Sequence, residues 1–292
     1  MPSNSPTDKP LPPGLYVVTT PIGNMADITL RALKVLAEVD LVAAEDTRHT
    51  RRLLAHHHID QSLVSYHEHN EIERTATLIQ QLEAGAAIAL VSDAGTPTVS
   101  DPGYRLVQAA AERGLPIFPV PGVSAAITAL SVSGLPTDQF TFVGFPSRKK
   151  NKRAEQLADL ARLSHTLIFY QSPQRLHAFL DELVEALGDR PAVLGREMTK
   201  LHEEFIRGTL SDIIRALDRK ETIKGECTLL VAGAATAEPH GEEEIDAAIR
   251  MAVEDRQAPL SDIARELAAR FNVNRKRIYD QALHCRKALD EK

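Results

Sequence analysis

Short apolar runs alternate along the chain with longer stretches in which apolar residues recur every three or four positions. The short runs are typical of buried strands, and the longer stretches are typical of amphipathic helices. In the first half of the chain this alternation predicts a parallel, doubly wound sheet. Strands are predicted within 15–24, 41–48, 87–97 and 116–122, and helices over 27–40, 104–114 and 124–134, with Gly114 and Gly134 closing the last two.

The same kinds of segment recur after residue 138 with a different spacing. The strands here are short, and a long gap at 201–224 separates the last two. A mixed sheet is therefore expected rather than a purely parallel one. Strands are predicted within 139–146, 165–173, 191–200 and 225–234, and helices over 153–163 and after 173.

The last part of the chain is predicted to be helical. A polar stretch with Pro and Gly at 236–244 has the composition of a linker. The final two helices are joined by a tight turn, which is typical of a helix-turn-helix, with Ser261 as N-cap and Asn272 in the turn. The helices are predicted over 243–255, 260–271 and 275–287.

A length of 292 residues leaves room for more than one domain. We expect an α/β protein with two α/β domains, the first built on a doubly wound parallel sheet and the second on a mixed sheet, and a small helix-turn-helix module. The first residues carry no apolar run and are expected to be disordered. The expected segments are a tail at 1–13, domains at 14–135 and 136–235, and a linker with the helical module at 236–292.

Composition narrows the class of protein. Hydrophobic residues make up 43% and charged residues 25%, as in ordinary soluble proteins. Without an apolar run of about 18 residues or a signal-peptide start, a cytoplasmic protein is expected. Cys227 and Cys285 make neither a disulfide framework nor a zinc site. Because the net charge is -6, any nucleic-acid contact must come from local basic clusters, of which 147–153 and 274–287 are the candidates.

One loop stands out chemically. The stretch LVSDAGTPTVSDPGYRL at 90–106 ends a predicted buried strand in residues rich in Gly, Asp and Thr. Small residues let backbone N–H and C=O groups approach a ligand closely. Since α/β proteins bind ligands at the carboxyl ends of their strands, the loop is a candidate binding edge. A tight turn that only links strand to helix is the alternative.

Several stretches together resemble the group of the tetrapyrrole methylase family that acts on small-subunit ribosomal RNA. The resemblance spans residues 14 to about 233, and the helical tail fits the same group. Any one stretch is weak alone, but the set is specific. The stretches are LYVVTTPIGNMADITLRAL, AAEDTRHTRRLL, HEHNE, LVSDAGTPTVSDPGYRLV, PVPGVSA, FVGFPSRKK, FYQSPQRL and REMTKLHEEFIRGTL.

The resemblance implies an S-adenosylmethionine-dependent enzyme with its cofactor between two α/β domains. It further implies methyl transfer to the ribose 2'-hydroxyl of a cytidine in the decoding region of 16S ribosomal RNA, and a homodimer. Relatives that act on tetrapyrroles carry Gly-Asp-Pro where this chain has Gly95, Thr96 and Pro97, so any carboxylate role there would pass to Asp93. The implied cofactor residues are Pro21, Ile22, Gly23, Ser92, Asp93, Ala94, Gly95, Thr96, Val99, Ser124, Ala125, Tyr170, Gln171 and Thr228. Ser124 as a helix cap and Tyr170 as a core aromatic are the structural alternatives.

Methyl transfer to a hydroxyl is an in-line displacement, in which positioning contributes more than a proton acceptor. Polar residues at the ends of predicted strands are the candidates for handling that proton or gripping the nucleotide. An Asp46–Arg48 pair with helix capping by Thr47 is the alternative for the first group. Lys200 is favoured as a partner for phosphate, because a free ammonium cannot accept a proton. The candidates are Glu45, Asp46, Arg48, Glu197 and Lys200, with His69 and Asn70 beside them.

Basic residues are expected to hold RNA through its phosphates rather than its bases. Arg51 and Arg52 would extend the same track beside Arg48. The triplet His56–His58 is expected on the surface, His67 and His69 on one face of a strand, and no metal is expected. The predicted RNA-binding residues are Arg148, Lys149, Lys150, Lys152, Arg153, Arg275, Lys276 and Arg277.

Two other functions remain open at this point. A corrin or porphyrin C-methyltransferase of the same fold would need neither the basic loop nor the helical tail. A non-enzymatic regulator with a ligand-sensing α/β domain would bind duplex DNA through 274–284.

Overall fold

The computed structural model describes residues 11–235, 242–255, 258–271 and 273–290. The chain divides into two compact units, of which the first ends at Ala234 and the second begins at Ala235. Most of the predicted tail and most of the predicted linker, 1–10 and 236–241, lie outside the described residues. Within the described part of the tail, Leu11 packs partly against the core of the first sheet.

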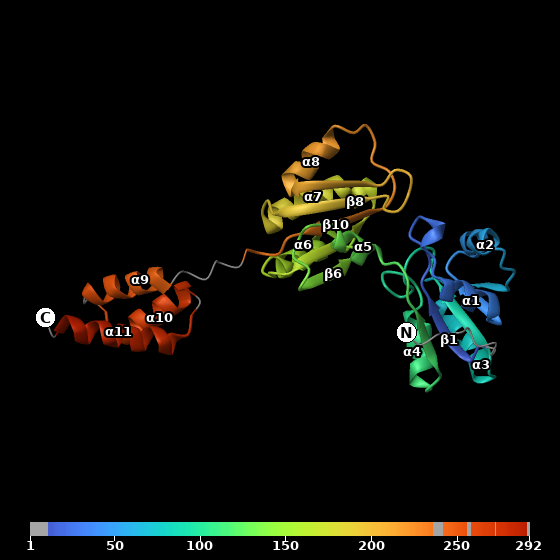
Figure 1. The fold of residues 1–292 in the computed structure, drawn as a ribbon, viewed down its shortest axis with the longest axis horizontal. Coiled ribbons are helices and arrows are strands. Elements are labelled where there is room, and N and C mark those ends of the chain that lie inside the picture. The colour runs from blue at the N-terminus through green and yellow to red at the C-terminus, as the bar shows by residue number, and fades with distance from the viewer. Residues whose placement is uncertain (1–10, 236–241, 256–257, 272, 291–292) are drawn as a thin grey trace, which may run out of the picture. The chain divides into compact units, whose positions relative to one another are not determined.

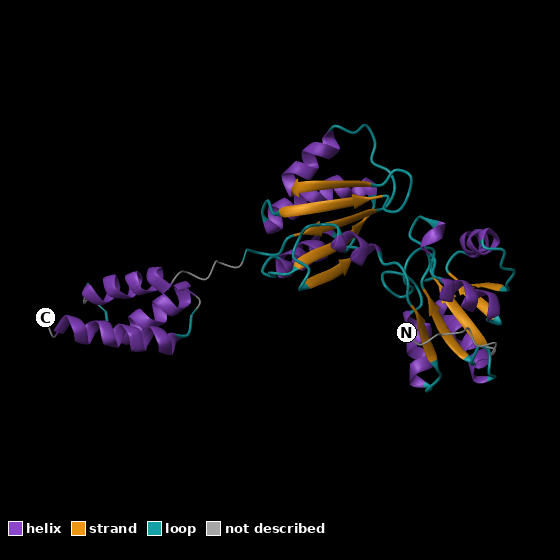
Figure 2. Ribbon diagram, in the orientation of Figure 1, coloured by secondary structure: helices purple, strands orange, loops and turns teal. Residues whose placement is uncertain are grey.

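The first sheet has five strands, all parallel, in the order β3-β2-β4-β1-β5 (Figures 1 and 2). Its central strands are apolar and buried on both faces, as parallel strands covered by helices are. The strands are β1 (Gly14–Val18), β2 (Leu41–Ala44), β3 (Leu63–Ser65), β4 (Ala87–Val91) and β5 (Ile117–Val120).

Helices cover both faces of this sheet, which confirms the doubly wound prediction. One face packs on α1 and α2 through Leu36 and Leu54, and the other packs on α3 and α4 through Leu78 and Leu106. The chain runs from β1 toward one edge and from β4 toward the other, so the loops after these adjacent strands turn to opposite faces. The helical segments are η1 (Met25–Asp27), α1 (Leu30–Glu38), α2 (Thr47–His56), α3 (Glu71–Glu83) and α4 (Tyr104–Glu112).

The second sheet is mixed, as predicted, in the order β6-β7-β10-β8-β9. Strands β6 and β7 are parallel, and every other pairing is antiparallel. The gap at 201–224 in the sequence pattern holds an edge strand and a helix that the pattern did not predict. The strands are β6 (Phe140–Gly144), β7 (Thr166–Gln171), β8 (Pro191–Arg196), β9 (Glu204–Thr209) and β10 (Cys227–Val231).

One face of the second sheet packs on α6 (Lys150–Leu160), α7 (Pro173–Leu187) and α8 (Leu210–Asp218). The opposite face packs on α5 (Ala125–Ser131), whose Ala129 and Leu130 are buried among residues of β7, β8 and β10 (Figure 1). The helix predicted over 124–134 is thus shorter, and it lies on the second sheet rather than the first. A domain boundary at residue 135 remains a proposal. The packing of α5 on the second sheet favours a boundary before α5.

The second unit contains α9 (Glu242–Glu254), α10 (Leu260–Phe271) and α11 (Arg275–Asp290), packed around a core of their own that includes Ile249, Leu267 and Ile278. Helix α10 begins at Leu260, so Ser261 lies inside its first turn and is not the predicted N-cap. Asn272 lies outside the described residues. No described helix has the length and apolar character needed to cross a membrane.

Candidate active site

The loops after β1 and β4 are joined at the carboxyl edge of the first sheet. The backbone N–H of Thr20 donates to the C=O of Gly95 over 2.9 Å, and the N–H of Gly95 donates back over 3.0 Å. Gly95 has a φ of +80°, where any side chain is strained. The Thr96 hydroxyl lies 3.3 Å from that of Thr19, so Thr96 helps to close this junction.

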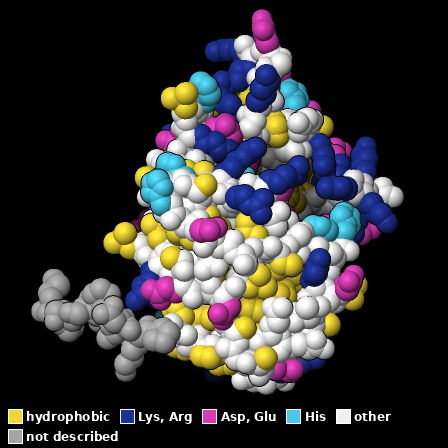
Figure 3. Space-filling model, turned by 90° about the vertical axis from the view of Figure 1, so that its right-hand side faces the viewer, with side chains coloured by type: hydrophobic (Ala, Val, Ile, Leu, Met, Phe, Trp, Pro, Cys, Tyr) yellow, Lys and Arg dark blue, Asp and Glu magenta, His cyan; other side chains and the backbone are white. Residues whose placement is uncertain are grey.

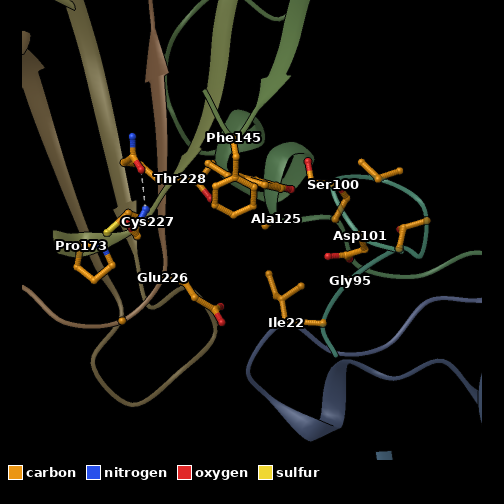
Figure 4. Close-up of a pocket in the computed structure, with 18 residues that line it drawn as sticks. Ile22, Gly95, Ser100, Asp101, Ala125, Phe145, Pro173, Glu226, Cys227 and Thr228 are labelled. Carbon is orange, nitrogen blue, oxygen red and sulfur yellow. Dashed lines mark hydrogen bonds between the residues drawn. The ribbon is translucent and has the colours of Figure 1, made fainter. Parts of the chain in front are cut away.

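A cavity of about 380 Å³ opens between this edge and the second sheet (Figure 4). Loops of the first sheet supply Ile22 and Gly95, the start of α5 supplies Ala125, and the second sheet supplies Phe145 and Thr228. Its size falls within the roughly 300 to 1,000 Å³ of typical small-molecule sites. The cavity therefore depends on both sheets.

Most of the predicted cofactor residues line this one cavity, although they come from distant parts of the sequence. Those in the lining are Ile22, Ala94, Gly95, Thr96, Val99, Ser124, Ala125, Tyr170, Gln171 and Thr228. Pro21, Gly23 and Asp93 instead line an adjoining cavity of about 160 Å³. Ser92 is buried and lines neither. Asp93 Oδ1 accepts from the N–H of Asp46, so it faces the end of β2.

Sequence reasoning missed several lining residues, which are Ser100, Asp101, Phe145, Ser172, Pro173, Gly225, Glu226 and Cys227. The Ser-Asp-Pro-Gly run at 100–103 was visible as a turn, but its approach to the second sheet was not. A side chain on Gly144 would lie 2.7 Å from Ser100 Oγ, so this glycine lets the loop rest on β6.

The lining suits a ligand that carries positive charge. The carboxylates of Asp101 and Glu226 turn into the cavity from opposite sides (Figure 4), and no described lining residue is Lys or Arg. Ser172 Oγ is buried without a hydrogen-bond partner in the described structure. Burial raises the pKa of the Cys227 thiol to about 11, so this group stays neutral. A sulfonium donor with polar groups fits such a site.

Tyr170 packs as an aromatic residue beside the cavity. Its hydroxyl accepts a hydrogen bond from the N–H of Ala126 over 3.2 Å, and its ring packs edge-on against Phe142 and Phe145. It also lines the cavity. Ser124 is the residue before α5, but its side chain makes no capping hydrogen bond.

A second, polar cavity of about 670 Å³ lies over the ends of β2 and β4, and we call it the polar cavity. Glu45, His67 and His69 are in its lining. The two histidines follow β3 in a turn rather than on a strand face, because Asn70 Oδ1 accepts from the N–H of His67 and closes that turn. Burial, with the carboxylates of Asp93 and Asp46, raises the pKa of Glu45.

Asp46 and Arg48 form the ion pair that was the structural alternative, with 2.8 Å between Oδ2 and Nη2. Asp46 itself caps α2 by accepting from the N–H of Arg48, so Thr47 is the first helical residue and not the cap. Hydrogen bonds from Arg48 hold the pKa of Asp46 well below its usual range. Neither residue lines any of the three cavities.

Glu197 and Lys200 form a second pair beside the cavity of about 160 Å³. Lys200 Nζ lies 2.8 Å from Glu197 Oε1 and 3.3 Å from Glu226 Oε2. Partial burial lowers the pKa of Lys200, but the bond to Glu197 and the charge of Glu226 outweigh it, and the pKa is raised. Lys200 is thus a cation held by two carboxylates, and the N–H of Asn24 donates to the neighbouring Thr199.

The predicted RNA-binding residues divide into exposed and engaged groups. Arg148, Lys149, Lys150 and Lys152 are exposed near the start of α6. Arg153 is less available to bind RNA. Glu182 binds its guanidinium at 2.5 and 2.6 Å, and two backbone carbonyls accept hydrogen bonds from it.

In the second unit, Arg275 donates to the carbonyl of Ser261, Arg277 pairs with Glu242 at 2.8 Å, and Lys276 is exposed. On the face of the first unit that Figure 3 presents, Lys and Arg side chains gather around a hollow.

The histidine triplet does not form a common site. His56 is exposed and His57 half-buried beside it, and His58 takes a φ of +57° after the end of α2. Among the described residues, no group of three or more His, Cys, Asp or Glu side chains is placed to hold a metal ion.

Comparison with known proteins identifies the family. The family model for tetrapyrrole (corrin/porphyrin) methylases matches residues 14–214. Ribosomal RNA small subunit methyltransferase I of Micromonospora olivasterospora is 50% identical over 237 residues, which are 81% of this chain and 75% of that protein. The protein of the same name from Mesorhizobium japonicum is 44% identical over 284 residues, 97% of this chain and 96% of its own length.

Solved structures share the fold. The uroporphyrin-III C-methyltransferase of Thermus thermophilus superposes with a TM-score of 0.54 over 75% of this chain and 93% of its own, at 24% identity. At that identity the likeness shows the fold alone, whereas the two relatives named above match 81% and 97% of this chain at 50% and 44% identity. The chain belongs to the tetrapyrrole methylase family and, within it, to the ribosomal RNA small subunit methyltransferase I group.

Proposed function

We propose that the protein transfers a methyl group from S-adenosylmethionine to the ribose 2'-hydroxyl of a cytidine in the decoding region of 16S ribosomal RNA. The observation that supports this most directly is the cavity between the two sheets, whose lining gathers ten residues of the motifs shared with the family. Curated relatives named as ribosomal RNA small subunit methyltransferase I at 41% to 51% identity give the substrate class.

The residues that would hold the donor line the cavity from both sheets. The Gly95 loop exposes backbone groups, Ser172 Oγ offers an unused hydrogen-bonding atom, and Asp101 and Glu226 balance positive charge. When bound, the donor supplies a methyl carbon made electrophilic by the adjacent sulfonium.

The chain's own part in the reaction is positioning. The bridge between Thr20 and Gly95 and the contact of Thr199 with Asn24 fix the loops around the cavity. Such ordering of reactants can contribute about 7 to 11 kcal/mol to lowering a barrier. The polar cavity beside it leaves room for a nucleotide to approach from the side of β2.

Exposed basic residues at the start of α6 and on α11 would hold the RNA through its phosphates. Lys149 and Lys276 represent the two clusters. We further propose that the enzyme works in the cytoplasm as a homodimer and needs no metal ion. The homodimer follows the family resemblance, and the metal-free chemistry follows from the sulfonium donor.

The test is a methyl-transfer assay with small-subunit particles that lack the modification. Labelled S-adenosylmethionine is expected to place one methyl group on a cytidine ribose. Transfer to uroporphyrinogen with none to RNA would favour the tetrapyrrole activity instead. Specific binding of duplex DNA without methyl transfer would favour the regulator.

A further inference from the structure

The loop between β8 and β9 carries an exposed leucine at its tip. Leu201 is 93% exposed, more than any other large apolar side chain among the described residues. Met198, three residues earlier, is buried among residues of α5 and the second sheet. One apolar side chain of the loop thus anchors it to the sheet, and the other projects into water.

The backbone of this loop is strained and held in place. Glu197 has a φ of +50° and Thr199 a φ of +65°, which cost free energy for residues with side chains. The N–H of Thr199 donates to Glu203 Oε2 over 2.7 Å, and its hydroxyl accepts from the N–H of Asn24 over 3.0 Å. A single exposed leucine needs no explanation by itself, but one fixed at the tip of a strained loop points to a function.

The tip lies at the rim of the candidate active site. Lys200, which precedes Leu201, lines the cavity of about 160 Å³. Glu226 lines both that cavity and the larger cavity between the sheets. A ribose that reaches a donor between the sheets would therefore bring its neighbouring nucleotides toward this rim.

Helix α2 adds positive charge to the same rim. His49 and Leu53 of this helix line the cavity of about 160 Å³. Arg52 follows His49 by three residues, so the two are neighbours on the helix surface. Arg52 is exposed and forms no ion pair with another described residue. Positive charge beside an apolar tip complements RNA, whose phosphates are anionic and whose unpaired bases expose flat faces that can stack.

We propose that Leu201 is a docking residue for unpaired RNA and packs against the base of a nucleotide next to the target cytidine. This inference rests on the proposed function. Leucine is among the apolar side chains that proteins place against the bases of nucleic acids. Because the loop is fixed before RNA binds, little conformational entropy is lost when the contact forms. The contact favours unpaired RNA, since the bases of a duplex are stacked on both faces.

The first experiment measures the affinity for small-subunit particles that lack the modification, by filter binding. Leu201→Ala is expected to raise the dissociation constant by about tenfold or more, because an apolar contact is lost, whereas Leu201→Met keeps most of the contact and stays near wild type. Leu30→Ala is the matched control, because Leu30 is 86% exposed at the start of α1 and lines none of the three cavities. An unchanged affinity in Leu201→Ala would overturn the proposal, as would an equal loss in Leu30→Ala.

Two further measurements separate this contact from other roles of the loop. The S-adenosylhomocysteine affinity of Leu201→Ala in calorimetry and its molar mass in light scattering are expected to match the wild type. A fall in S-adenosylhomocysteine affinity would make Leu201 part of the donor site. A change in molar mass would place it between two copies of the chain. Either result overturns the proposal.

Salt dependence gives another readout. In Leu201→Ala the log–log plot of RNA affinity against salt concentration is expected to shift without a change of slope, because no phosphate contact is lost. A shallower slope would contradict an apolar contact. If the wild-type protein neither binds the particles nor methylates their RNA, the proposed function fails. Methylation by the wild type with unchanged particle affinity in Leu201→Ala overturns this inference alone.

Discussion

Asp101 illustrates how a residue that lines the cavity can weaken the fold that holds it. Burial, and then the like charge of Glu45, raise the pKa of Asp101 in the folded protein to about 7, above the 3.8 of an unperturbed carboxyl group. The folded state therefore binds the proton more tightly than the unfolded state does. The resulting stabilisation is fully present below about pH 4 and is lost as the pH rises through 7.

Asp101→Asn should accordingly stabilise the protein at pH 8 and have less effect at pH 5. We expect a gain in the free energy of unfolding of about 1 to 2 kcal/mol at pH 8, after allowing for solvent screening of a half-buried group. Urea unfolding at the two pH values measures it. An equal effect at both, or destabilisation at pH 8, would contradict the charge environment described here.

Gly23 tests the contact between the loops of the two sheets. A β-carbon at this position would lie 2.5 Å from Lys200 Cγ and 2.7 Å from Thr199 Oγ1. Gly23→Ala should therefore displace the Lys200 loop and weaken S-adenosylhomocysteine binding at least tenfold in calorimetry. Gly114→Ala is the control, because its φ of +66° brings backbone strain but no atom lies within 4 Å of the new carbon. Equal affinities in the two variants would argue against the contact.

At the scale of single residues, the loop around Gly95 could be predicted from the sequence. Its small residues directly follow a buried strand, so the pattern lies within one short stretch. The same local logic could not find Ser172 or Glu226. Their role in the cavity exists only because the second sheet meets the first, and no pattern within either stretch records that contact. Helix capping by Thr47 was part of the structural alternative for this group, but the carboxylate of Asp46 caps α2.

At the scale of elements, Arg153 joins α6 to α7. Its guanidinium is mostly buried and binds Glu182 in a bidentate way, and the hydrogen bond from Arg153 lowers the pKa of Glu182. We expect Arg153→Ala to lower the free energy of unfolding by about 1 to 3 kcal/mol. Lys152→Ala, one residue away and exposed, should change it by less than about 0.5 kcal/mol.

Chemical denaturation measures the difference in stability between these two variants, and an RNA-binding assay measures the difference in RNA affinity. Lys152→Ala is expected to weaken RNA affinity at unchanged stability. The reverse assignment, with Lys152→Ala unfolding more easily than Arg153→Ala, would contradict the structure of this loop.

The elements themselves were largely predictable, because period-2 and period-3.6 patterns reflect local burial. Strand β9 was not predicted because an edge strand with Glu204 and Arg207 along it lacks a continuous apolar run. The sheet on which α5 packs could not be predicted for a different reason. Its apolar face shows that the helix is buried, but not on which of two sheets.

At the scale of the whole molecule, RNA binding must depend on clusters because the net charge is -6. Since Arg153 and Arg277 pair with glutamates, six of the predicted basic residues are left to meet phosphates. Single-stranded RNA binding should then weaken with a log–log salt slope of about -4.

Replacing Arg148, Lys149, Lys150 and Lys152 together by Ala should reduce that slope to about -1.4, because two phosphate contacts remain. Filter binding across a range of salt concentrations measures it, with S-adenosylhomocysteine affinity as the control that stays constant. An unchanged slope would place the RNA elsewhere on the protein.

The most direct measurement of the central claim is the mapping of one methyl group. Small-subunit particles without the modification are incubated with the protein and labelled S-adenosylmethionine, and the RNA is digested to nucleosides for mass spectrometry. The account predicts one 2'-O-methylcytidine per RNA molecule. A methyl group on a base carbon, or none on RNA from folded protein that binds S-adenosylhomocysteine, would contradict it.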